Sequence, residues 1–133
     1  MSMIKKPFYS SKVIIILVPL LLLFVNGVCI YFLGVKVIEE NRIDKVFHIL
    51  GGVSVSFSAA GVLWHLVHRK IIALQDEYVL RMLVYGFVCL AVINWEIIEY
   101  IVVEHEHLTY SDTITDMICG LIGGLGAIFF IRR

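Results

Sequence analysis

Four long apolar stretches follow one another along the chain, at residues 13–35, 46–67, 80–103 and 113–131. Each is close to the ~20 residues that an α-helix needs to cross the hydrocarbon core of a bilayer. The stretches are continuously apolar rather than alternating, which favours helices over the strands of a membrane barrel. Pro19 and Asn26 interrupt the first stretch, and we expect a neighbouring helix to satisfy the backbone groups they leave. The pattern predicts an all-α integral membrane bundle of four transmembrane helices, forming a single domain over residues 1–133.

The composition supports a membrane protein, because the 133 residues are 60% hydrophobic and 17% charged, with a mean hydropathy of +0.94. Soluble domains are nearer about half apolar and about a quarter charged. The formal net charge is +0 and no basic patch with interleaved aromatic residues occurs, so we expect no nucleic-acid partner. The first stretch exceeds the ~7–15 residues of a signal-peptide core and no A-x-A-like site follows it, which predicts a retained helix. Cys29, Cys89 and Cys119 lie in three different stretches, which predicts buried thiols rather than a disulfide or zinc framework.

The placement of lysine and arginine predicts the orientation in the membrane. Eight of these residues fall on one side of the predicted spans: Lys5, Lys6, Lys12, Arg69, Lys70, Arg81, Arg132 and Arg133. Only Lys36, Arg42 and Lys45 fall on the other side. Because positive residues favour the cytoplasmic side, we expect both termini in the cytoplasm and the acidic residues near the outer face.

Ionisable side chains occur inside three of the four predicted spans. His48 lies near the start of the second span, Glu96 and Glu99 near the end of the third, and Asp116 near the start of the fourth. At ~1.5 Å per residue, His48, Glu99 and Asp116 reach similar depths below the outer surface, with Glu96 one turn deeper. Three helices therefore offer polar groups to one layer of the membrane.

Small residues lie on the same helix faces as these polar side chains. Successive helical residues rotate by ~100°, which places Gly120 and Gly123 in line with Asp116, and Gly52 in line with His48. Small residues let transmembrane helices approach closely. We therefore expect these faces to be helix–helix interfaces, with the polar side chains pointing into the bundle.

Several carboxylates in one membrane layer need compensation, because a single central Asp costs about 2.5–3.5 kcal/mol and neighbouring carboxylates repel. No Lys or Arg lies in the inner part of the second, third or fourth stretch, and His48 alone cannot neutralise Glu96, Glu99 and Asp116. Bound metal or shared protons are the expected remedies. Carboxylates with one imidazole suit a divalent Mg, Mn, Zn or Fe ion, so the candidate metal ligands are His48, Glu96, Glu99 and Asp116. A hydrogen-bonded polar lock between helices is the alternative.

Other polar residues are expected to have ordinary structural roles. Asn94 faces away from Glu96 and Glu99 along its helix, and we expect it to form a hydrogen bond with another helix. His65 and His68 are expected at the cytoplasmic interface. A short outer loop with two further histidines and two glutamates, at positions 104–107, is expected to lie near the acidic cluster.

Three motifs carry a family resemblance: Asp44-Lys45-Val46-Phe47-His48 with Gly52, Trp95-Glu96-Ile97-Ile98-Glu99-Tyr100, and Asp112-Thr113-Ile114-Thr115-Asp116-Met117 ahead of Gly123-Gly124. Across residues 44–126 the chain resembles the YjdF family of bacterial inner-membrane proteins, which is related to the VanZ-like group. It departs at Ala60-Gly61, where the family often has an Arg-Glu pair, and at Ile114, where the family often has Gln. The resemblance implies a multi-pass protein of the bacterial inner (plasma) membrane with these candidate residues, and it implies no reaction.

Three functions fit these residues, and the sequence leaves open whether the chain is an enzyme. The first is a metal-assisted hydrolase or transferase acting on a lipid or lipid-linked envelope substrate near the outer leaflet. Its candidate catalytic residues are Asp112 and Glu96. Asp112 would either orient the metal ligands or act as a general base. The second is ion or proton conduction, since intramembrane Asp, Glu and His also mark ion paths, and it calls for a homo-oligomer. The third is an accessory or assembly protein whose polar cluster only fixes helix packing.

Overall fold

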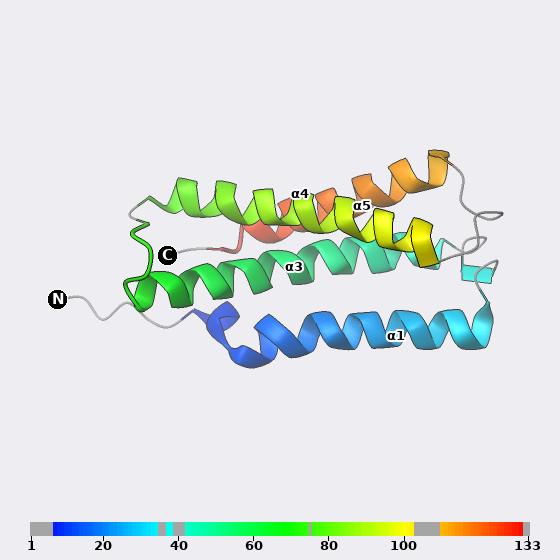
Figure 1. The fold of residues 1–133 in the computed structure, drawn as a ribbon, viewed down its shortest axis with the longest axis horizontal. Coiled ribbons are helices and arrows are strands. Elements are labelled where there is room, and N and C mark those ends of the chain that lie inside the picture. The colour runs from blue at the N-terminus through cyan, green and yellow to red at the C-terminus, as the bar shows by residue number, and fades with distance from the viewer. Residues whose placement is uncertain (1–6, 35–36, 39–41, 75, 103–109, 132–133) are drawn as a thin grey trace.

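The computed structural model describes residues 7–34, 37–38, 42–74, 76–102 and 110–131. Its elements in chain order are η1 (Phe8–Ser10), η2 (Val13–Leu17), α1 (Val18–Leu33), α3 (Ile43–His68), α4 (Glu77–Val102) and α5 (Tyr110–Ile128). These residues form helices and turns without any strand, and the four long helices run side by side as an elongated bundle (Figure 1). The expected all-α class is therefore confirmed.

The first helical span begins with a π-helical turn, η2, that runs directly into α1. Pro19 lies in the first turn of α1. Proline has no N–H, and its ring clashes with the carbonyl four residues earlier, which here belongs to Ile15 of η2. We attribute the wider η2 turn to this clash. No residue of α1 is fully buried, and α1 packs on α3 without contacting the described parts of α4 or α5.

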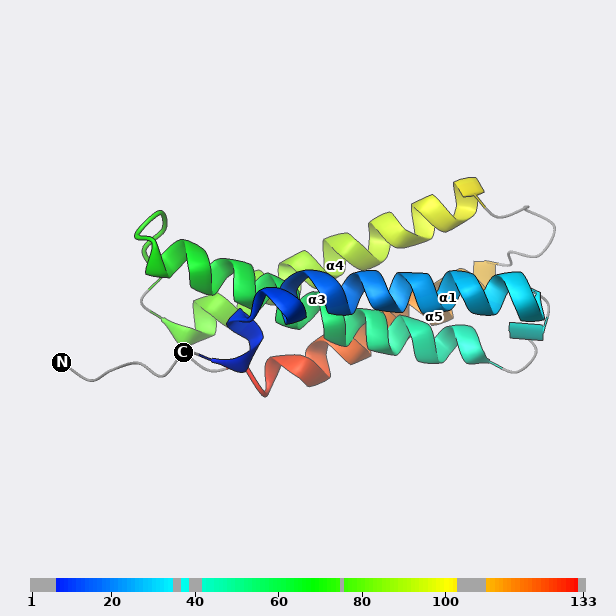
Figure 2. The ribbon, with the colours of Figure 1, turned by 90° about the horizontal axis from the view of Figure 1, so that it is seen from below.

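Glycines from both helices let α3 and α5 pack closely, and both views show the two helices alongside each other (Figures 1 and 2). A methyl group at Gly52 would overlap the backbone of Gly120, and one at Gly123 would overlap the backbone of α3. Ser56 donates a 3.0 Å hydrogen bond to the carbonyl oxygen of Gly124 across the same interface. Close approach of this kind is what small residues permit in membrane helices. The predicted small-residue interfaces are therefore confirmed.

Valines of α4 cover the other side of the α5 glycines. Val92 lies against Gly120 and Val88 lies against Gly124. Val84 and Val88 have no exposed surface, so this face of α4 is core rather than periphery. The helices α3, α4 and α5 thus form a three-helix unit in which α4 runs antiparallel to α3. Helix α1 packs against the α3 side of this unit.

An apolar cluster closes the end of the bundle where the described chain begins and ends. It consists of Tyr9, Ala60, Leu63, Leu80, Val84, Ile128 and Ile131. Tyr9 is only 2% exposed because η1 turns inward, and this burial raises the pKa of the Tyr9 hydroxyl above its ordinary value of 10. Arg81 donates a 3.1 Å hydrogen bond from Nε to the carbonyl oxygen of Ile131. Positions 9 and 131 therefore lie at the same end of the bundle, whose assignment to the cytoplasm stays a prediction.

The structure supports three of the four expected membrane spans on length and apolar character, namely Val13–Leu33, Ile43–His68 and Glu77–Ile101. The fourth helix, α5, is present but is not among the helices that are long and apolar enough to count as candidate spans. It has 19 residues, a length of roughly 28 Å at 1.5 Å per residue, and it carries Asp112 and Asp116 in its first two turns. One face of α5 is buried against α3 and α4. That α5 crosses the membrane stays a prediction.

Candidate functional site

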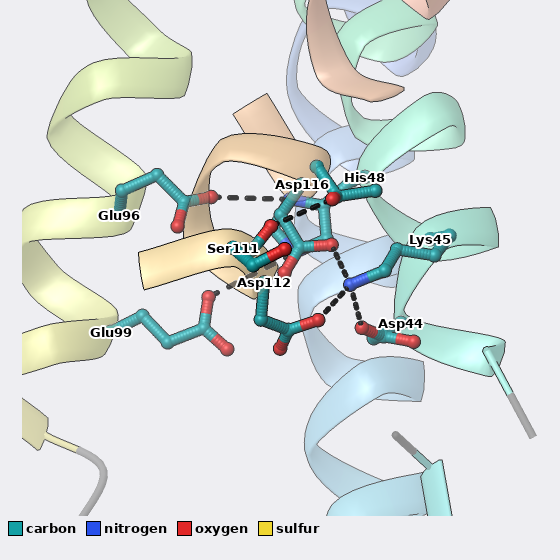
Figure 3. Close-up of polar contacts among 9 residues, drawn as sticks. Asp44, Lys45, His48, Glu96, Glu99, Ser111, Asp112 and Asp116 are labelled. Atoms are coloured by element: carbon teal, nitrogen blue, oxygen red, sulfur yellow. Dashed lines mark hydrogen bonds and ion pairs between the residues drawn. The ribbon is translucent and has the colours of Figure 1, made fainter. Parts of the chain in front are cut away.

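Seven ionisable side chains from three helices meet at one site (Figure 3). This site lies at the end of the bundle opposite the apolar cluster. The start of α3 and the start of α5 lie at this end, and so does the end of α4, because α4 runs antiparallel to both (Figure 1). The helices contribute Asp44, Lys45 and His48 from α3, Glu96 and Glu99 from α4, and Asp112 and Asp116 from α5. The sequence-based expectation that His48, Glu99 and Asp116 face one another is confirmed.

Lys45 lies at the centre of the first half of this site. Its Nζ is 2.8 Å from an oxygen of Asp44, 2.5 Å from Asp112 and 2.7 Å from Asp116. The side chains are 17% exposed for Lys45 and 14%, 27% and 7% for the three aspartates, so these contacts are largely shielded from water. Three carboxylates and one ammonium leave this group with a formal charge of −2. We call these four residues the lysine group.

His48 lies at the centre of the second half, between two glutamates. Its Nδ1 is 3.5 Å from Oε1 of Glu96, and its Nε2 is 3.9 Å from Oε2 of Glu99. Both separations exceed the 2.7–3.2 Å that is usual for an N–H···O hydrogen bond. His48 and Glu96 are each 9% exposed, and Glu99 is 25% exposed. We call these three residues the histidine group.

Asp116 connects the two groups. The oxygen Oδ1 that contacts Lys45 also lies 3.8 Å from Nε2 of His48. A single carboxylate from α5 thus faces the cation of one group and the imidazole of the other. Any change of charge in one group is therefore felt directly in its neighbour.

Each group holds three side chains of the kinds that bind metals, with ligand atoms within 4.8 Å of one another: His48, Glu96 and Glu99 in one, and Asp44, Asp112 and Asp116 in the other. The aspartates already share the ammonium of Lys45. Glu96 Oε1 and Glu99 Oε2 are buried and accept no hydrogen bond from any described residue, and the same holds for Asp44 Oδ1 and Asp116 Oδ1 of the lysine group. Buried oxygens of this kind call for a partner. The Lys45 ammonium lies 2.7 Å from Asp116 Oδ1 and 2.8 Å from the other oxygen of Asp44, whereas the histidine group contains no lysine or arginine, so it is the better candidate metal centre.

The sequence-based interpretation missed the role of Lys45. It placed this lysine outside the membrane and concluded that no cation was available to the acidic residues, which is wrong for the aspartates. The cause is the flexible four-carbon stem of lysine, which lets an ammonium reach its partners at a distance from its own backbone. A signal was present, since Lys45 lies three residues before His48 and such residues share a helix face.

Other expected polar residues lie outside the site. Asn94 donates a 2.7 Å hydrogen bond to the carbonyl oxygen of Leu90 in its own helix, so the expected bond to another helix is wrong. A polar side chain on an exposed helix face forms a hydrogen bond within its own helix when no neighbouring helix is in reach.

His65 lies at the other end of the bundle, 2.9 Å from the carbonyl oxygen of Ser10. The three cysteines are free, and the loop at 104–107 lies outside the described residues.

Comparison with known proteins identifies a family but no activity. A family described as "Predicted membrane protein (DUF2238)" matches residues 4–133. No curated protein and no solved structure matches the chain. The match extends over nearly the whole chain and agrees with the long apolar helices. The chain therefore belongs to the DUF2238 family of predicted membrane proteins.

Proposed function

We propose that the histidine group binds a divalent metal ion and that the protein is a metal-assisted hydrolase or transferase of the bacterial inner membrane. The observation that carries the proposal is a group of three part-buried ligand side chains that do not hydrogen-bond one another, with ligand atoms within 4.8 Å of one another. His48 Nδ1 lies 3.5 Å from Glu96, and His48 Nε2 lies 3.9 Å from Glu99, so the two glutamates face different nitrogens of the ring. Two ligands at about 2.1 Å from a tetrahedral ion lie roughly 3.4 Å apart. Because one ion binds a single ring nitrogen, a shared ion requires a side-chain shift that brings both glutamates to the same nitrogen.

The charge of the site supports the same proposal. With a neutral imidazole, Glu96 and Glu99 give the histidine group a formal charge of −2 beside the −2 of the lysine group. Carboxylates crowded in a shielded site repel one another. A divalent cation offsets two of these charges. It binds the glutamates in their ionised form and the imidazole in its neutral form. Mg, Mn, Zn and Fe ions all accept such ligands, so the donor set does not select among them.

The residues around such an ion have distinct proposed roles. Glu96, Glu99 and His48 bind it, and Asp116, at 3.8 Å from His48, is the fourth candidate ligand. Asp112, held by Lys45, is the candidate general base, while Glu96 takes part in catalysis as a ligand. A divalent ion here supplies Lewis-acid chemistry toward a phosphoryl or carbonyl oxygen, or toward a water molecule. The proposed substrate is a lipid or lipid-linked molecule, and the likeness to YjdF and VanZ-like proteins stays a prediction that supplies no reaction.

A purely structural role is the second candidate, and the lysine group favours it. Lys45 ties α3 to α5 through Asp112 and Asp116, which is what a polar lock between helices requires. Ion conduction is less well supported, because the opposite end of the bundle is filled by the apolar cluster that includes Leu63, Val84 and Ile128. Association of several copies, which conduction calls for, stays a prediction.

Metal binding by purified protein tests the proposal. After removal of metals with a chelator, titration calorimetry with Mn²⁺ and Zn²⁺ should show one site per chain. Glu96→Gln, Glu99→Gln and His48→Gln should each weaken binding at least tenfold, which is about 1.4 kcal/mol. Glu77→Gln is the matched control, because Glu77 begins the same helix but pairs with Arg81 at the other end.

Two results separate the candidate functions. Equal metal binding by wild type and Glu96→Gln would contradict the metal centre, as would a wild-type protein that binds neither ion below millimolar concentration. Glu96→Gln that binds no metal but keeps the fold supports the metal centre. Loss of the fold in the same variant, with no metal bound by the wild type, supports the structural lock.

A further inference from the structure

A cavity of about 210 Å³ lies between α1, α3 and α4, directly beside the histidine group. Its α1 wall is formed by Pro19, Leu22, Leu23 and Asn26. This is the place where α1 stands away from the three-helix unit, since α1 packs on α3 and does not contact the described residues of α4. Figure 1 shows α1 along the outer edge of the bundle, beside α3. The cavity is therefore the space left between a peripheral apolar helix and the core helices.

The lining of the cavity is mainly hydrocarbon. Phe47 and Val55 of α3, Ala91 and Val92 of α4 and the α1 leucines supply most of it. Apolar cavities of about 150 Å³ stay dry in other proteins and bind apolar molecules. Open space also lies at Gly51, which lines the cavity and where an added methyl group would meet no atom within 4 Å. This composition favours an apolar ligand over a polar one.

One wall of the cavity belongs to the histidine group itself. His48 lines the cavity and also lies 3.5 Å from Glu96. Trp95, next to Glu96 in the chain, lines the same cavity. The cavity is therefore mainly apolar, and the His48 imidazole is the part of the histidine group that lines it. A ligand with a hydrocarbon part and a polar part fits this arrangement.

The volume limits what the cavity can hold. At about 210 Å³ it is smaller than the roughly 300–1,000 Å³ of pockets that enclose whole small molecules. It is larger than the apolar cavity of about 150 Å³ that binds benzene in another protein. A segment of an alkyl chain, the main apolar group of a bilayer, has a size and chemistry that fit this space.

We propose that the cavity between α1, α3 and α4 binds part of an alkyl chain of a membrane lipid, with the polar end of that lipid at His48. The surrounding bilayer supplies this chain directly, because α1 has no fully buried residue and so faces lipid. Alkyl-chain binding requires only the cavity. That the bound lipid is the substrate rests on the proposed function and names its class: a lipid whose polar group reaches His48 while its chain is held beside α1.

Photolabelling in nanodiscs tests the cavity site. The probe is a phospholipid with a diazirine in its acyl chain, and the labelled positions are mapped by mass spectrometry on metal-free protein. In the wild type, label is expected at half-buried cavity residues such as Leu22, Val55 and Ala91. Gly51→Leu fills the open space and should lower labelling at these positions at least fivefold. Gly86→Leu is the matched control, because Gly86 is exposed, has equal room for a side chain and does not line the cavity.

Each outcome decides the proposal. Selective loss of label in Gly51→Leu, with Gly86→Leu unchanged, supports it. If Gly51→Leu does not fold, as judged by circular dichroism, Val55→Phe fills the same cavity from the next turn of α3. Unchanged labelling in a folded filling variant would overturn the proposal, as would wild-type label confined to exposed residues such as Phe24.

The same experiment separates this inference from the metal centre. The labelling needs no metal, and Glu96→Gln should keep it, since Glu96 does not line the cavity. Alkyl-chain labelling with no metal binding leaves the cavity site in place and overturns the metal centre. Metal binding with labelling that the filling variants do not change leaves the metal centre in place and overturns the cavity site.

Discussion

Replacement of Lys45 by methionine removes the cation that three carboxylates share while keeping a long unbranched side chain. Lys45 Nζ contacts Asp44 at 2.8 Å, Asp112 at 2.5 Å and Asp116 at 2.7 Å. Without the ammonium, the lysine group changes from a formal charge of −2 to −3. Two of the three contacts cross from α3 to α5. We therefore expect Lys45→Met to lower the free energy of unfolding and to loosen the start of α5.

The expected loss is about 3–4 kcal/mol at pH 7. Breaking one side of a buried ion pair costs about 3–5 kcal/mol, whereas exposed pairs contribute only about 0–1 kcal/mol. The first range applies because the Lys45 side chain is 17% exposed and that of Asp116 is 7% exposed. The loss of stability has an upper limit, because an aspartate can take up a proton and so remove the extra negative charge. For a water-exposed aspartate of pKa about 3.9, this protonation takes about 4 kcal/mol at pH 7. The same step takes about 1.5 kcal/mol at pH 5, so the loss should shrink as the pH falls.

The assay is unfolding in mixed micelles by increasing dodecyl sulfate, followed by circular dichroism at pH 7 and pH 5. Lys12→Met is the matched control, because Lys12 is exposed at the opposite end, and its expected change is within about 0.5 kcal/mol. Lys45→Met combined with Asp112→Asn restores the formal charge of −2 and should recover part of the loss. A loss below about 1 kcal/mol at pH 7, or one that grows toward pH 5, would refute the reasoning.

Two further substitutions test the packing of α3 on α5. Gly52→Ala should cost about 1–3 kcal/mol, since the new methyl group overlaps the backbone of α5, whereas Gly86→Ala meets no atom within 4 Å and should not destabilise. Ser56→Ala should cost about 1 kcal/mol through loss of the 3.0 Å hydrogen bond to Gly124. Ser54→Ala is its control, because Ser54 Oγ is buried without a hydrogen-bond partner among the described residues, and this change should leave stability unchanged or raise it. The same unfolding assay measures all four variants, and equal losses within either pair would contradict the packing described.

Much of the architecture follows from the order of apolar and polar residues. Long apolar runs predicted helices at 13–35, 46–67 and 80–103, and the structure has them at Val13–Leu33, Ile43–His68 and Glu77–Val102. The α3–α5 interface could be predicted because Gly52 and Gly120 lie on the same faces as the polar residues. Helical periodicity alone determines such faces.

The division of the site into two groups could not be predicted from periodicity. Periodicity places backbones, whereas the position of the Lys45 ammonium depends on a flexible side chain that chooses among several acids. Hydropathy also counts Lys45 as a cation outside the span. The inward turn of η1, which buries Tyr9 and brings Ser10 to His65, was likewise not predicted. It depends on contacts between residues more than fifty positions apart.

Anomalous scattering from a Mn²⁺-soaked crystal tests the metal centre most directly. The account predicts one strong peak between α3 and α4, at about 2.0–2.2 Å from a His48 nitrogen and from oxygens of Glu96 and Glu99. Lys45 should remain with Asp44 and Asp112 in the same crystal. Absence of any peak near His48, or a peak among the aspartates with Lys45 displaced, would contradict it.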